Sequence, residues 1–418
     1  MPRVDMRDML NHAYRECYAV GAFDLVALDF LEAIVAGAEA TRAPVILSLA
    51  ESHFEHYDFM LAMAATVAAA RRASVPVAIH LDHGASLDSA VRAINLGCNG
   101  VMVDASTQTF EENVARTRAV VAMAHACGVP VEGELGYVAG VEGEDAEKHP
   151  GEVIYTAPSE AKSYVERSGV DFLAVSIGTV HGRLRGAPKL DFERLRQINE
   201  TLRLPLVIHG GTGLSEVQYR TLIENGVTKI NYYTALADAA GASIRARAAH
   251  DAHAGYTGLL KDVRAAIQAE VERCIKLWGA AGRADELLRE CRFREPVEHV
   301  IIYNVEGATD AEVETIMARG REVLATIPGV RRVVTGWAVA DEPRYRFCWL
   351  IEFASRAVID SYREHPLHRQ FADELFRPIA GDRVSVDFEH VHAVPAVPVS
   401  KIRESAPGCN KAQPHCAE

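Results

Sequence analysis

Residues 75–104 read VPVAIHLDHGASLDSAVRAINLGCNGVMVD, and they contain a complete strand–helix–strand pattern. The apolar runs VPVAIHL (75–81) and CNGVMVD (98–104) enclose a longer stretch of helical composition. This order is typical of a parallel βαβ unit, in which a helix carries the chain back to start the next strand. The same alternation extends in both directions, from about residue 18 to about residue 250.

Eight such runs can be counted in this region. They are AVGAFDL (19–25), APVILSLA (43–50), VPVAIHL (75–81), CNGVMVD (98–104), VPVEGEL (129–135), VDFLAVSI (170–177), LPLVIHG (204–210) and VTKINYY (227–233). Eight parallel units favour a closed (β/α)8 barrel, a TIM barrel, over an open doubly wound sheet. No GxGxxG sequence follows the first run, which argues further against a dinucleotide-binding fold.

A different pattern begins at Pro296. Strands are expected at 297–305, 330–339, 346–353 and 382–389, and helices at 310–325 and 355–376. The order β-α-β-β-α-β predicts a ferredoxin-like α+β domain. We therefore divide the chain into a barrel (1–290), a ferredoxin-like domain (296–391) and a Pro-rich tail (392–418) that we expect to be disordered.

Before the second domain, residues 259–287 are expected to form a long amphipathic helix that packs outside the barrel and ends near Gly279 and Gly282.

The composition is that of a soluble globular protein, with 49% hydrophobic and 24% charged residues among 418. The formal net charge of −13 has no compensating basic tract, so nucleic acid is not an expected partner. No apolar run approaches the roughly 20 residues that span a bilayer, and the first residues lack the apolar core of a secretory signal. We therefore expect no membrane partner. Because the eight cysteines are scattered without a CxxC pair, we expect a reduced, cytoplasmic protein.

Three histidines occupy equivalent positions in this pattern. His83 follows VPVAIHL, His181 follows VDFLAVSIGTV, and His209 lies in LPLVIHGG, so all three fall at carboxyl ends of predicted barrel strands. Barrel enzymes place catalysis at that end. Three neutral imidazoles with an open fourth position suit a catalytic Zn²⁺, which polarises a carbonyl as a Lewis acid. A single strand-end histidine is more often a core or loop residue, but three together, each beside a glycine, favour a metal site.

A family resemblance rests on motifs that occur in matching order. They are HLDHG, GTVHG, HGGTG, VMVDAS (101–106), VEGELGYVAGVEGED (131–145), PKLDF (188–192) and KINYYT (229–234). Most of residues 1–285 resembles the class II fructose-bisphosphate and tagatose-bisphosphate aldolases, the ketose-bisphosphate aldolase family. The resemblance implies a metal-dependent carbon–carbon lyase that cleaves or forms a ketose (bis)phosphate through the metal-stabilised enediolate of a dihydroxyacetone-phosphate-like donor. It also implies a small phosphorylated substrate and Zn²⁺ or another divalent metal as cofactor.

The resemblance assigns roles to acidic residues. Asp82 corresponds to the family's proton donor and acceptor on the hydroxyl of the cleaved bond. Glu134 resembles the residue that approaches the metal when the metal shifts, and Asp104 a carboxylate that orients a ligand or holds a secondary monovalent cation. The base that enolises the donor is expected at Glu142, with Glu144 as the alternative because the charge spacing of this loop departs from the family pattern. A solvated acidic turn remains an alternative for the loop.

Glycine-rich turns are expected to bind phosphate through backbone N–H groups. The residues that resemble the family's phosphate and ketone contacts are Gly182, Gly210, Gly211, Thr212, Asn231 and Thr234. Ala50 and Asp24 stand where serine and asparagine are usual in the family, and Tyr232 and Tyr233 replace smaller residues, so we expect an altered pocket. His53, in AESHFEHYDF, is expected to be a polar loop residue rather than part of a second metal site. Two alternatives stay open: a metal-dependent aldolase or lyase on a non-phosphorylated or aromatic substrate, and a non-catalytic ligand-binding or assembly module.

The second domain carries a resemblance of its own. VEHVIIYNV, IPGV and SYREHPLHRQF are similar to the stress-responsive α/β-barrel family over about residues 297–390, whose members pair two ferredoxin-like units into a dimeric barrel. That similarity implies a homodimer or a higher even homo-oligomer. Some plant members catalyse aldol cyclisation of polyketides, and the corresponding site would use Tyr362 and His368, with His299 lining the cleft. The alternative, which we favour, is that HPLH (365–368) caps and packs a helix while the domain serves dimerisation.

Overall fold

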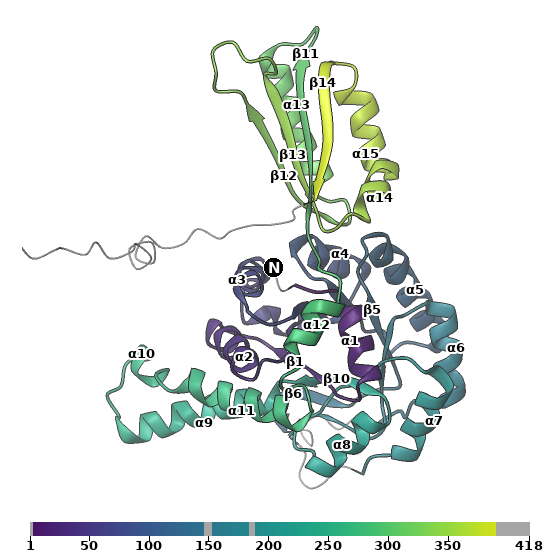
Figure 1. Cartoon of the computed structure of the whole chain (residues 1–418), viewed down its shortest axis with the longest axis vertical. Helices are drawn as coiled ribbons and strands as arrows, with labels where there is room; N and C mark the ends of the chain where they lie inside the picture. The colour runs from purple at the N-terminus through teal and green to yellow at the C-terminus, as the bar shows by residue number, and fades with distance from the viewer. Residues whose placement is uncertain (1–2, 146–152, 184–188, 390–418) are drawn as a thin grey trace, which may run out of the picture.

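The computed structural model describes residues 3–145, 153–183 and 189–389, without the side chains of residues 141–143. Within these residues, eight parallel strands close into a barrel in the order β1-β10-β9-β7-β5-β4-β3-β2, surrounded by helices (Figure 1). The strands are β1 (Val20–Asp24), β2 (Val45–Ala50), β3 (Val77–Gly84), β4 (Gly100–Val103), β5 (Val131–Leu135), β7 (Phe172–Val175), β9 (Leu206–Ile208) and β10 (Val227–Tyr232). The predicted (β/α)8 barrel is confirmed, and each predicted strand overlaps one of these.

The barrel strands form where apolar runs are buried on both faces. Every residue of β1, β2 and β5 is buried, because the inner face fills the barrel and helices cover the outer face. The covering helices are α2 (Leu28–Ala40), α3 (Phe59–Arg72), α4 (Leu87–Leu96), α5 (Phe110–Ala126), α6 (Pro158–Ser168), α7 (Phe192–Leu202), α8 (Glu216–Glu224) and α9 (Thr234–His250). Thr109 and Ser215 form capping boxes that fix the starts of α5 and α8.

Further elements lie at the two ends of the barrel. At the amino end, the segment before α1 (Met6–Arg15) joins the start of β3, where the Val4 N–H donates to the Val77 carbonyl at 3.1 Å. At the carboxyl end, the 3₁₀ turn η1 (Glu51–Glu55) follows β2. The short strands β6 (Gly140–Asp145) and β8 (His181–Arg183) form a separate two-stranded parallel sheet. The sequence pattern did not predict β6 or β8, because neither is an apolar run.

The amphipathic helix expected at 259–287 is divided in the structure. Helix α11 (Val263–Leu277) packs against α2 and α9, and α12 (Ala284–Glu290) follows after a turn. Gly279 and Gly282 form this turn with φ of +75° and +82°, a conformation that suits glycine. With α10 (Tyr256–Leu259) and the end of α9, helix α11 forms an arm that projects from the barrel (Figure 1).

The second domain is an antiparallel sheet in the order β12-β13-β11-β14 with helices on one face. Its elements are β11 (Val297–Val305), α13 (Asp310–Leu324), β12 (Val330–Trp337), β13 (Phe347–Phe353), α14 (Val358–Glu364), α15 (Pro366–Phe371), the π-turn η3 (Ala372–Phe376) and β14 (Ala380–Glu389). The predicted ferredoxin-like α+β fold is confirmed, but the single helix predicted at 355–376 is wrong. Pro366 has no N–H to continue α14, and His365 before it is extended (φ −64°, ψ 134°), so the helix ends and restarts there.

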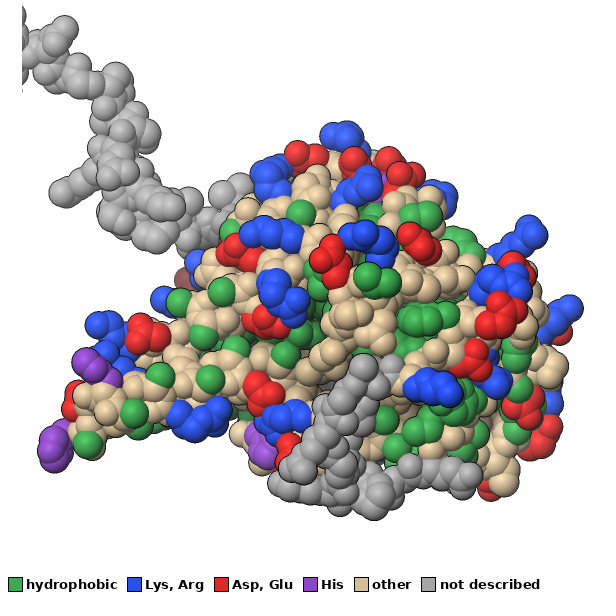
Figure 2. All heavy atoms as spheres, turned by 90° about the horizontal axis from the view of Figure 1, so that it is seen from below, with side chains coloured by type: hydrophobic (Ala, Val, Ile, Leu, Met, Phe, Trp, Pro, Cys, Tyr) green, Lys and Arg blue, Asp and Glu red, His purple; other side chains and the backbone are tan. Residues whose placement is uncertain are grey.

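Polar side chains join the two domains. Asn95 on α4 donates from Nδ2 to the carbonyls of Ala325 and Ile327 at 3.2 and 3.1 Å, and Ser355 Oγ donates to the Cys127 carbonyl at 2.9 Å. On the face shown in Figure 2, basic and acidic side chains are interspersed and neither sign gathers into a broad patch. Each helix in the described part of the chain is too short or too polar to cross a membrane. The predicted tail, residues 392–418, lies outside the described residues.

Candidate active site

Three histidines meet at the carboxyl end of the barrel. His83 lies near the end of β3, His209 directly follows β9, and His181 begins β8. The shortest contact, between His83 Nε2 and His209 Nδ1, is 2.9 Å, and one ring nitrogen of each histidine lies within 4.8 Å of the others. His83 has φ +46°, a left-handed conformation that costs a non-glycine residue roughly 1–2 kcal/mol. Such strain is characteristic of functional sites. The three histidines predicted from the sequence therefore form one compact cluster, and His83 is its strained member.

One ring nitrogen of each histidine is held by an oxygen acceptor. The pairs are His83 Nδ1 with Asp104 Oδ2 at 2.8 Å, His181 Nδ1 with the Val138 carbonyl at 3.2 Å, and His209 Nε2 with Glu132 Oε1 at 3.0 Å. Metal-ligating histidines are characteristically oriented in this way through their second nitrogen. The remaining nitrogens are His83 Nε2, His181 Nε2 and His209 Nδ1, and His181 Nε2 is buried without a hydrogen-bond partner. The residues therefore fit a divalent cation with three nitrogen ligands and an open position.

Asp82 lies beside this cluster with both oxygens fixed. The Asn231 Nδ2 donates to both oxygens at 2.9 Å, and Asp82 Oδ2 is 3.9 Å from His83 Nε2. Burial would raise the pKa of Asp82, but electrostatic interactions with His83, His209 and Lys229 outweigh it and hold the pKa well below its usual range. Asp82 is therefore an oriented carboxylate that stays ionised next to the histidine cluster, as a proton acceptor requires.

Three buried polar residues below the cluster were missed by sequence reasoning. Lys229 Nζ is 2.8 Å from Glu132 Oε2 and donates to Asn231 Oδ1 at 2.6 Å, while His80 Nε2 is 3.6 Å from the same Glu132 oxygen. His80, Glu132 and Lys229 are all 0% exposed. Burial raises the pKa of Glu132, but Lys229 outweighs it and lowers that pKa to about 2.

A signal for these residues was present in the sequence. His80, Glu132 and Lys229 each stand two positions before a predicted site residue on the same strand. Because side chains alternate along a strand, residues two apart point to the same face. Their polar side chains therefore had to enter the barrel interior together with the site residues.

Glu134 ends close to the histidines without a fixed partner. It is 2% exposed, its Oε2 lies 4.0 Å from His209 Nδ1, and that oxygen has no hydrogen bond among the described residues. Burial, reinforced by the negative charge of Asp104, raises the pKa of Glu134 to about 8. Glu134 also forms a second potential ligand group with His83 and Asp104. A carboxyl group in this position could gain a cation as partner.

The predicted base lies on β6. Glu142 belongs to this strand, but its side chain lies outside the described residues, and Glu144 is exposed. Strand β6 pairs Gly140 with His181. Gly140 has φ +102°, and a Cβ there would lie 2.2 Å from the His181 carbonyl oxygen, so only glycine allows this approach. The segment that carries both acids therefore starts directly beside a metal-site histidine.

The residues predicted to contact phosphate and ketone lie around the same mouth. They are Gly182 in β8, Gly210, Gly211 and Thr212 after β9, Asn231 in β10, and Thr234 at the start of α9. Gly210 has φ +65°, and a Cβ there would lie 2.2 Å from the Val180 carbonyl oxygen. No side chain caps the start of α9, and the start of a helix is a favourable place for an anion. Asn231 differs from the others, because its amide is directed at Asp82.

The residues that depart from the family pattern have different environments. Ala50 is buried and lies opposite Asp82 in the β2–β3 register, and Asp24 is buried at the end of β1. Tyr232 points out of the barrel, where its hydroxyl donates to Glu270 on α11 at 2.7 Å. The expectation that Tyr232 alters the pocket is therefore wrong, because alternate strand residues face opposite sides and Asn231 takes the inner position.

His53 and Tyr233 form an aromatic contact at the mouth. Their ring centroids are 4.5 Å apart, and His53 is 6% exposed although it belongs to the turn η1. Burial lowers the pKa of His53 to about 4 against the opposing charge of Asp82, so the ring is neutral at neutral pH. His53 is thus a buried neighbour of the site within the turn after β2.

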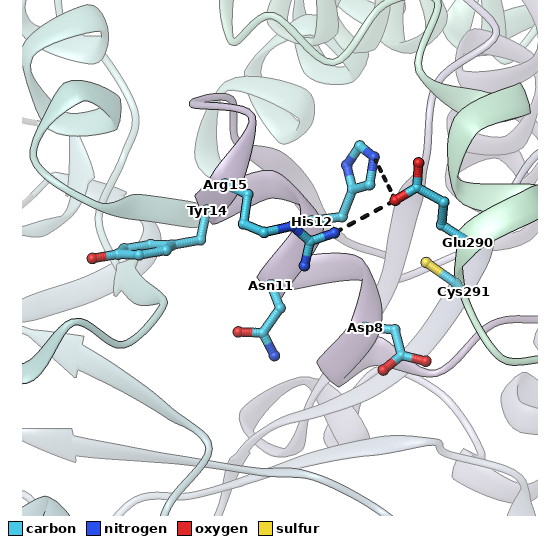
Figure 3. A pocket seen from close by; sticks show the side chains of 7 residues that line it. All are labelled: Asp8, Asn11, His12, Tyr14, Arg15, Glu290 and Cys291. Carbon is cyan, nitrogen blue, oxygen red and sulfur yellow. Dashed lines mark hydrogen bonds and ion pairs between the residues drawn. The ribbon is translucent and has the colours of Figure 1, made fainter.

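A separate cavity of about 330 Å³ lies between α1 and the end of α12. Its lining residues, labelled in Figure 3, are Asp8, Asn11, His12, Tyr14, Arg15, Glu290 and Cys291. Glu290 approaches His12 and Arg15 at 3.8 and 3.5 Å (Figure 3). His12 Nδ1 is 3.1 Å from the hydroxyl of Tyr18, just before β1, so this cavity is at the amino end of the barrel, away from the histidine cluster.

The candidate residues of the second domain also lie together. His299 Nδ1 is 2.6 Å from Asp387 Oδ1, and the rings of Tyr362 and His368 are 4.3 Å apart. Tyr362 is 5% exposed, its ring lies 4.8 Å from that of Phe353 at a tilt of 51°, and burial raises its pKa. The neighbours of His299, Tyr362 and His368 are therefore other side chains of the second domain.

Comparison with known proteins agrees with the geometry. The family model for fructose-bisphosphate aldolase class-II matches residues 4–283, and the model for the stress responsive A/B barrel domain matches residues 297–390. A probable fructose-bisphosphate aldolase of Bacillus subtilis is 44% identical over 56% of this chain and 82% of its own length. The fructose-bisphosphate aldolase of Geobacillus stearothermophilus is 40% identical over 68% of this chain and 99% of its own.

A solved aldolase structure is also similar to this chain. The YdjI aldolase of Escherichia coli K12 is 33% identical, with a TM-score of 0.60 over 68% of this chain and 99% of that one. The stretch that the aldolase family model matches, residues 4–283, contains the barrel and every residue of the histidine cluster. The chain belongs to the class II fructose-bisphosphate aldolase family, the metal-dependent aldolases, and carries a stress-responsive α/β-barrel domain after its barrel.

Proposed function

We propose that this aldolase reversibly cleaves a ketose (bis)phosphate into a dihydroxyacetone-phosphate-like donor and an aldehyde. The observation that carries the proposal is the juxtaposition of three oriented histidine nitrogens with the ionised carboxylate of Asp82. The relatives are named for fructose bisphosphate, so fructose 1,6-bisphosphate is the first compound to test.

His83, His181 and His209 would hold the divalent metal, which we propose is Zn²⁺. Bound there, the metal would supply Lewis-acid polarisation of the ketone oxygen. Glu134, with its free oxygen, is proposed as an alternative ligand if the metal shifts toward β5. Asp104 orients His83 by its 2.8 Å contact and is the proposed neighbour of any secondary monovalent cation.

Two carboxylates would move the protons. In cleavage, Asp82 takes the proton of the hydroxyl at the bond that breaks, and in condensation it returns that proton to the new alkoxide. Its ionised state and its fixation by Asn231 suit this role. Glu142 is the proposed base that removes the carbon-bound proton of the donor, with Glu144 as the alternative on the same segment.

The phosphate of the donor would bind among backbone N–H groups. Gly182, Gly210, Gly211 and Thr212 supply the turns, and Thr234 begins the uncapped helix α9. A helix start and adjacent glycine turns bind an anion through oriented dipoles. Ala50 offers no hydroxyl at this mouth, so we expect weaker phosphate binding than a serine would give.

The deciding experiment is a retro-aldol screen of fructose 1,6-bisphosphate, tagatose 1,6-bisphosphate and matching plain ketoses, with and without chelator. Chelator-sensitive cleavage of a phosphorylated ketose supports the proposal. Preference for the plain ketoses would support the alternative aldolase, and no cleavage by metal-loaded protein would contradict the proposal.

We propose that the second domain makes the chain a homodimer or a higher even oligomer. Val386 and Phe388 on β14 are 39% and 53% exposed, and β11 continues this face because Val386 pairs with Val300. The opposite face of the sheet is covered by helices. A second copy would cover this apolar face, so V386D should give a smaller particle in sedimentation velocity, whereas V339D at a fully exposed position should not.

For His299, Tyr362 and His368 we propose packing roles rather than a second aldol-type site. His365 Nδ1 accepts from the Leu367 N–H at 3.3 Å, which caps α15, and Tyr362 is enclosed by its neighbours. Y362F should then leave aldol turnover unchanged.

Because the cysteines in the described residues are all unpaired, we also propose a reducing, cytoplasmic setting.

A further inference from the structure

The small sheet at the barrel mouth has unequal strands. Strand β6 pairs with β8 at two points, Gly140 with His181 and Asp145 with Arg183. Between these points β6 advances from 140 to 145 while β8 advances only from 181 to 183. The additional residues of β6 must arch away from the shorter strand. Glu142 and Glu144 both lie in this arch, which we define as residues 141–144.

Both ends of the arch are fixed. At the first end, the backbone of Gly140 packs against the His181 carbonyl so closely that no side chain fits. At the second end, Arg183 Nη1 is 3.6 Å from Asp145 Oδ1. The arch is therefore tied to the two ends of β8, whose first residue is a metal-site histidine.

Arg183 is itself anchored to the barrel frame. Its Nε lies 2.9 and 2.8 Å from the two carboxylate oxygens of Asp238, and its Nη2 donates to the same carboxylate. Asp238 belongs to the second turn of α9, which directly follows the barrel strand β10. The hydrogen bonds to Asp238 raise the pKa of Arg183, so the guanidinium keeps its charge. A forked arginine–carboxylate pair also fixes direction, which a lysine would not do.

We infer that Arg183 is a positioning residue: by bridging Asp145 and Asp238 it holds the backbone of the arch, from which the proposed acid extends, beside His181. This inference rests on the proposed function, in which that acid removes the carbon-bound proton of the donor. Proton transfer demands close placement, and a displacement of about 1 Å can cost roughly 100-fold in rate. As a half-exposed ion pair, the same bridge contributes little to global stability, which separates the two roles experimentally.

The test compares R183M with the matched control R292M. Arg292 makes an equivalent forked pair with Asp8, at 2.9 Å for both contacts, but at the amino end of the barrel. Two readouts are taken on metal-loaded full-length protein. The first is amide hydrogen exchange of residues 140–145, and the second is exchange of deuterium from D₂O into dihydroxyacetone phosphate without an aldehyde.

We expect R183M to speed amide exchange in 140–145 at least about tenfold and to slow donor exchange by roughly 10–100-fold. Metal content and the KM of the donor should stay within about twofold, R183K should recover part of the rate, and R292M should match the native chain. D238N, which removes the fork but keeps Arg183, serves as the second variant if R183M does not fold.

Two results would overturn the inference: native amide exchange in 140–145 of R183M, or native donor exchange despite a loosened arch. If the native chain itself fails to exchange the donor, the proposed function fails instead. Amide exchange alone then decides whether Arg183 holds the arch.

Discussion

Replacement of Asp82 by asparagine removes the proton acceptor while keeping the size of the side chain. The carboxylate is fully buried, and Asn231 Nδ2 contacts both of its oxygens at 2.9 Å. D82N retains one acceptor for that amide but cannot take the hydroxyl proton. General acid–base catalysis contributes about 100- to 10,000-fold. At about 1.36 kcal/mol per tenfold, the barrier should therefore rise by about 2.7–5.4 kcal/mol.

The assay is retro-aldol turnover of fructose 1,6-bisphosphate, measured together with metal content. The matched control is D24N, because Asp24 is an equally buried carboxylate at the end of β1, separated from β3 by β2, and has no proposed proton role. We expect D82N to lose at least about 100-fold in kcat while D24N loses less than about tenfold. A D82N enzyme that holds metal and turns over within threefold of the native chain would refute the assignment.

Three further predictions concern the mouth and the fold. A50S should raise kcat/KM for phosphorylated ketoses by roughly 10- to 150-fold, since a hydrogen bond to a charged group is worth about 1.5–3 kcal/mol; an equal gain for plain ketoses would count against a phosphate site. G210A should lower the unfolding free energy by at least about 1–2 kcal/mol, because alanine resists φ +65° and its Cβ would meet Val180; urea denaturation measures this, and native stability would contradict it. Burial raises the pKa of Asp171, but hydrogen bonds from His125 and Arg7 outweigh it and lower the pKa, so its stabilisation is present above about pH 4 and is lost as pH falls through the lowered pKa. D171N should therefore be less stable at pH 7 and lose less on acidification, and parallel pH profiles would refute that.

The barrel was predictable because each strand is an apolar run followed by a helix. VPVAIHL and LPLVIHG mark their strands by composition alone, and the histidines that follow them fall at the strand ends. Strands β6 and β8 were not predictable in this way. Their pairing depends on a close backbone approach at Gly140. A glycine in a polar segment does not indicate which part of the chain its backbone will contact.

Some residues of the site were predictable from the sequence and others were not. Residues within recognisable motifs, such as His83 and Asp82, were predicted from the sequence. Lys229 and Glu132 were missed because strand alternation was not used to place them on the same face as Asn231 and Glu134, and their pairing across the barrel depends on strand order. The outward direction of Tyr232 was missed because strand alternation was not applied to the last strand. Arg183 was missed because its partner Asp238 lies 55 positions along the chain.

The central claim is that His83, His181 and His209 hold one divalent metal on which the aldolase depends. The most direct measurement is metal stoichiometry by elemental mass spectrometry, combined with cleavage activity before chelation, after it and after return of Zn²⁺. The account predicts about one metal per chain, loss of activity on chelation, recovery with Zn²⁺, and a metal-poor, inactive H181A variant. Full activity in chelated protein, or native metal content and activity in H181A, would contradict it.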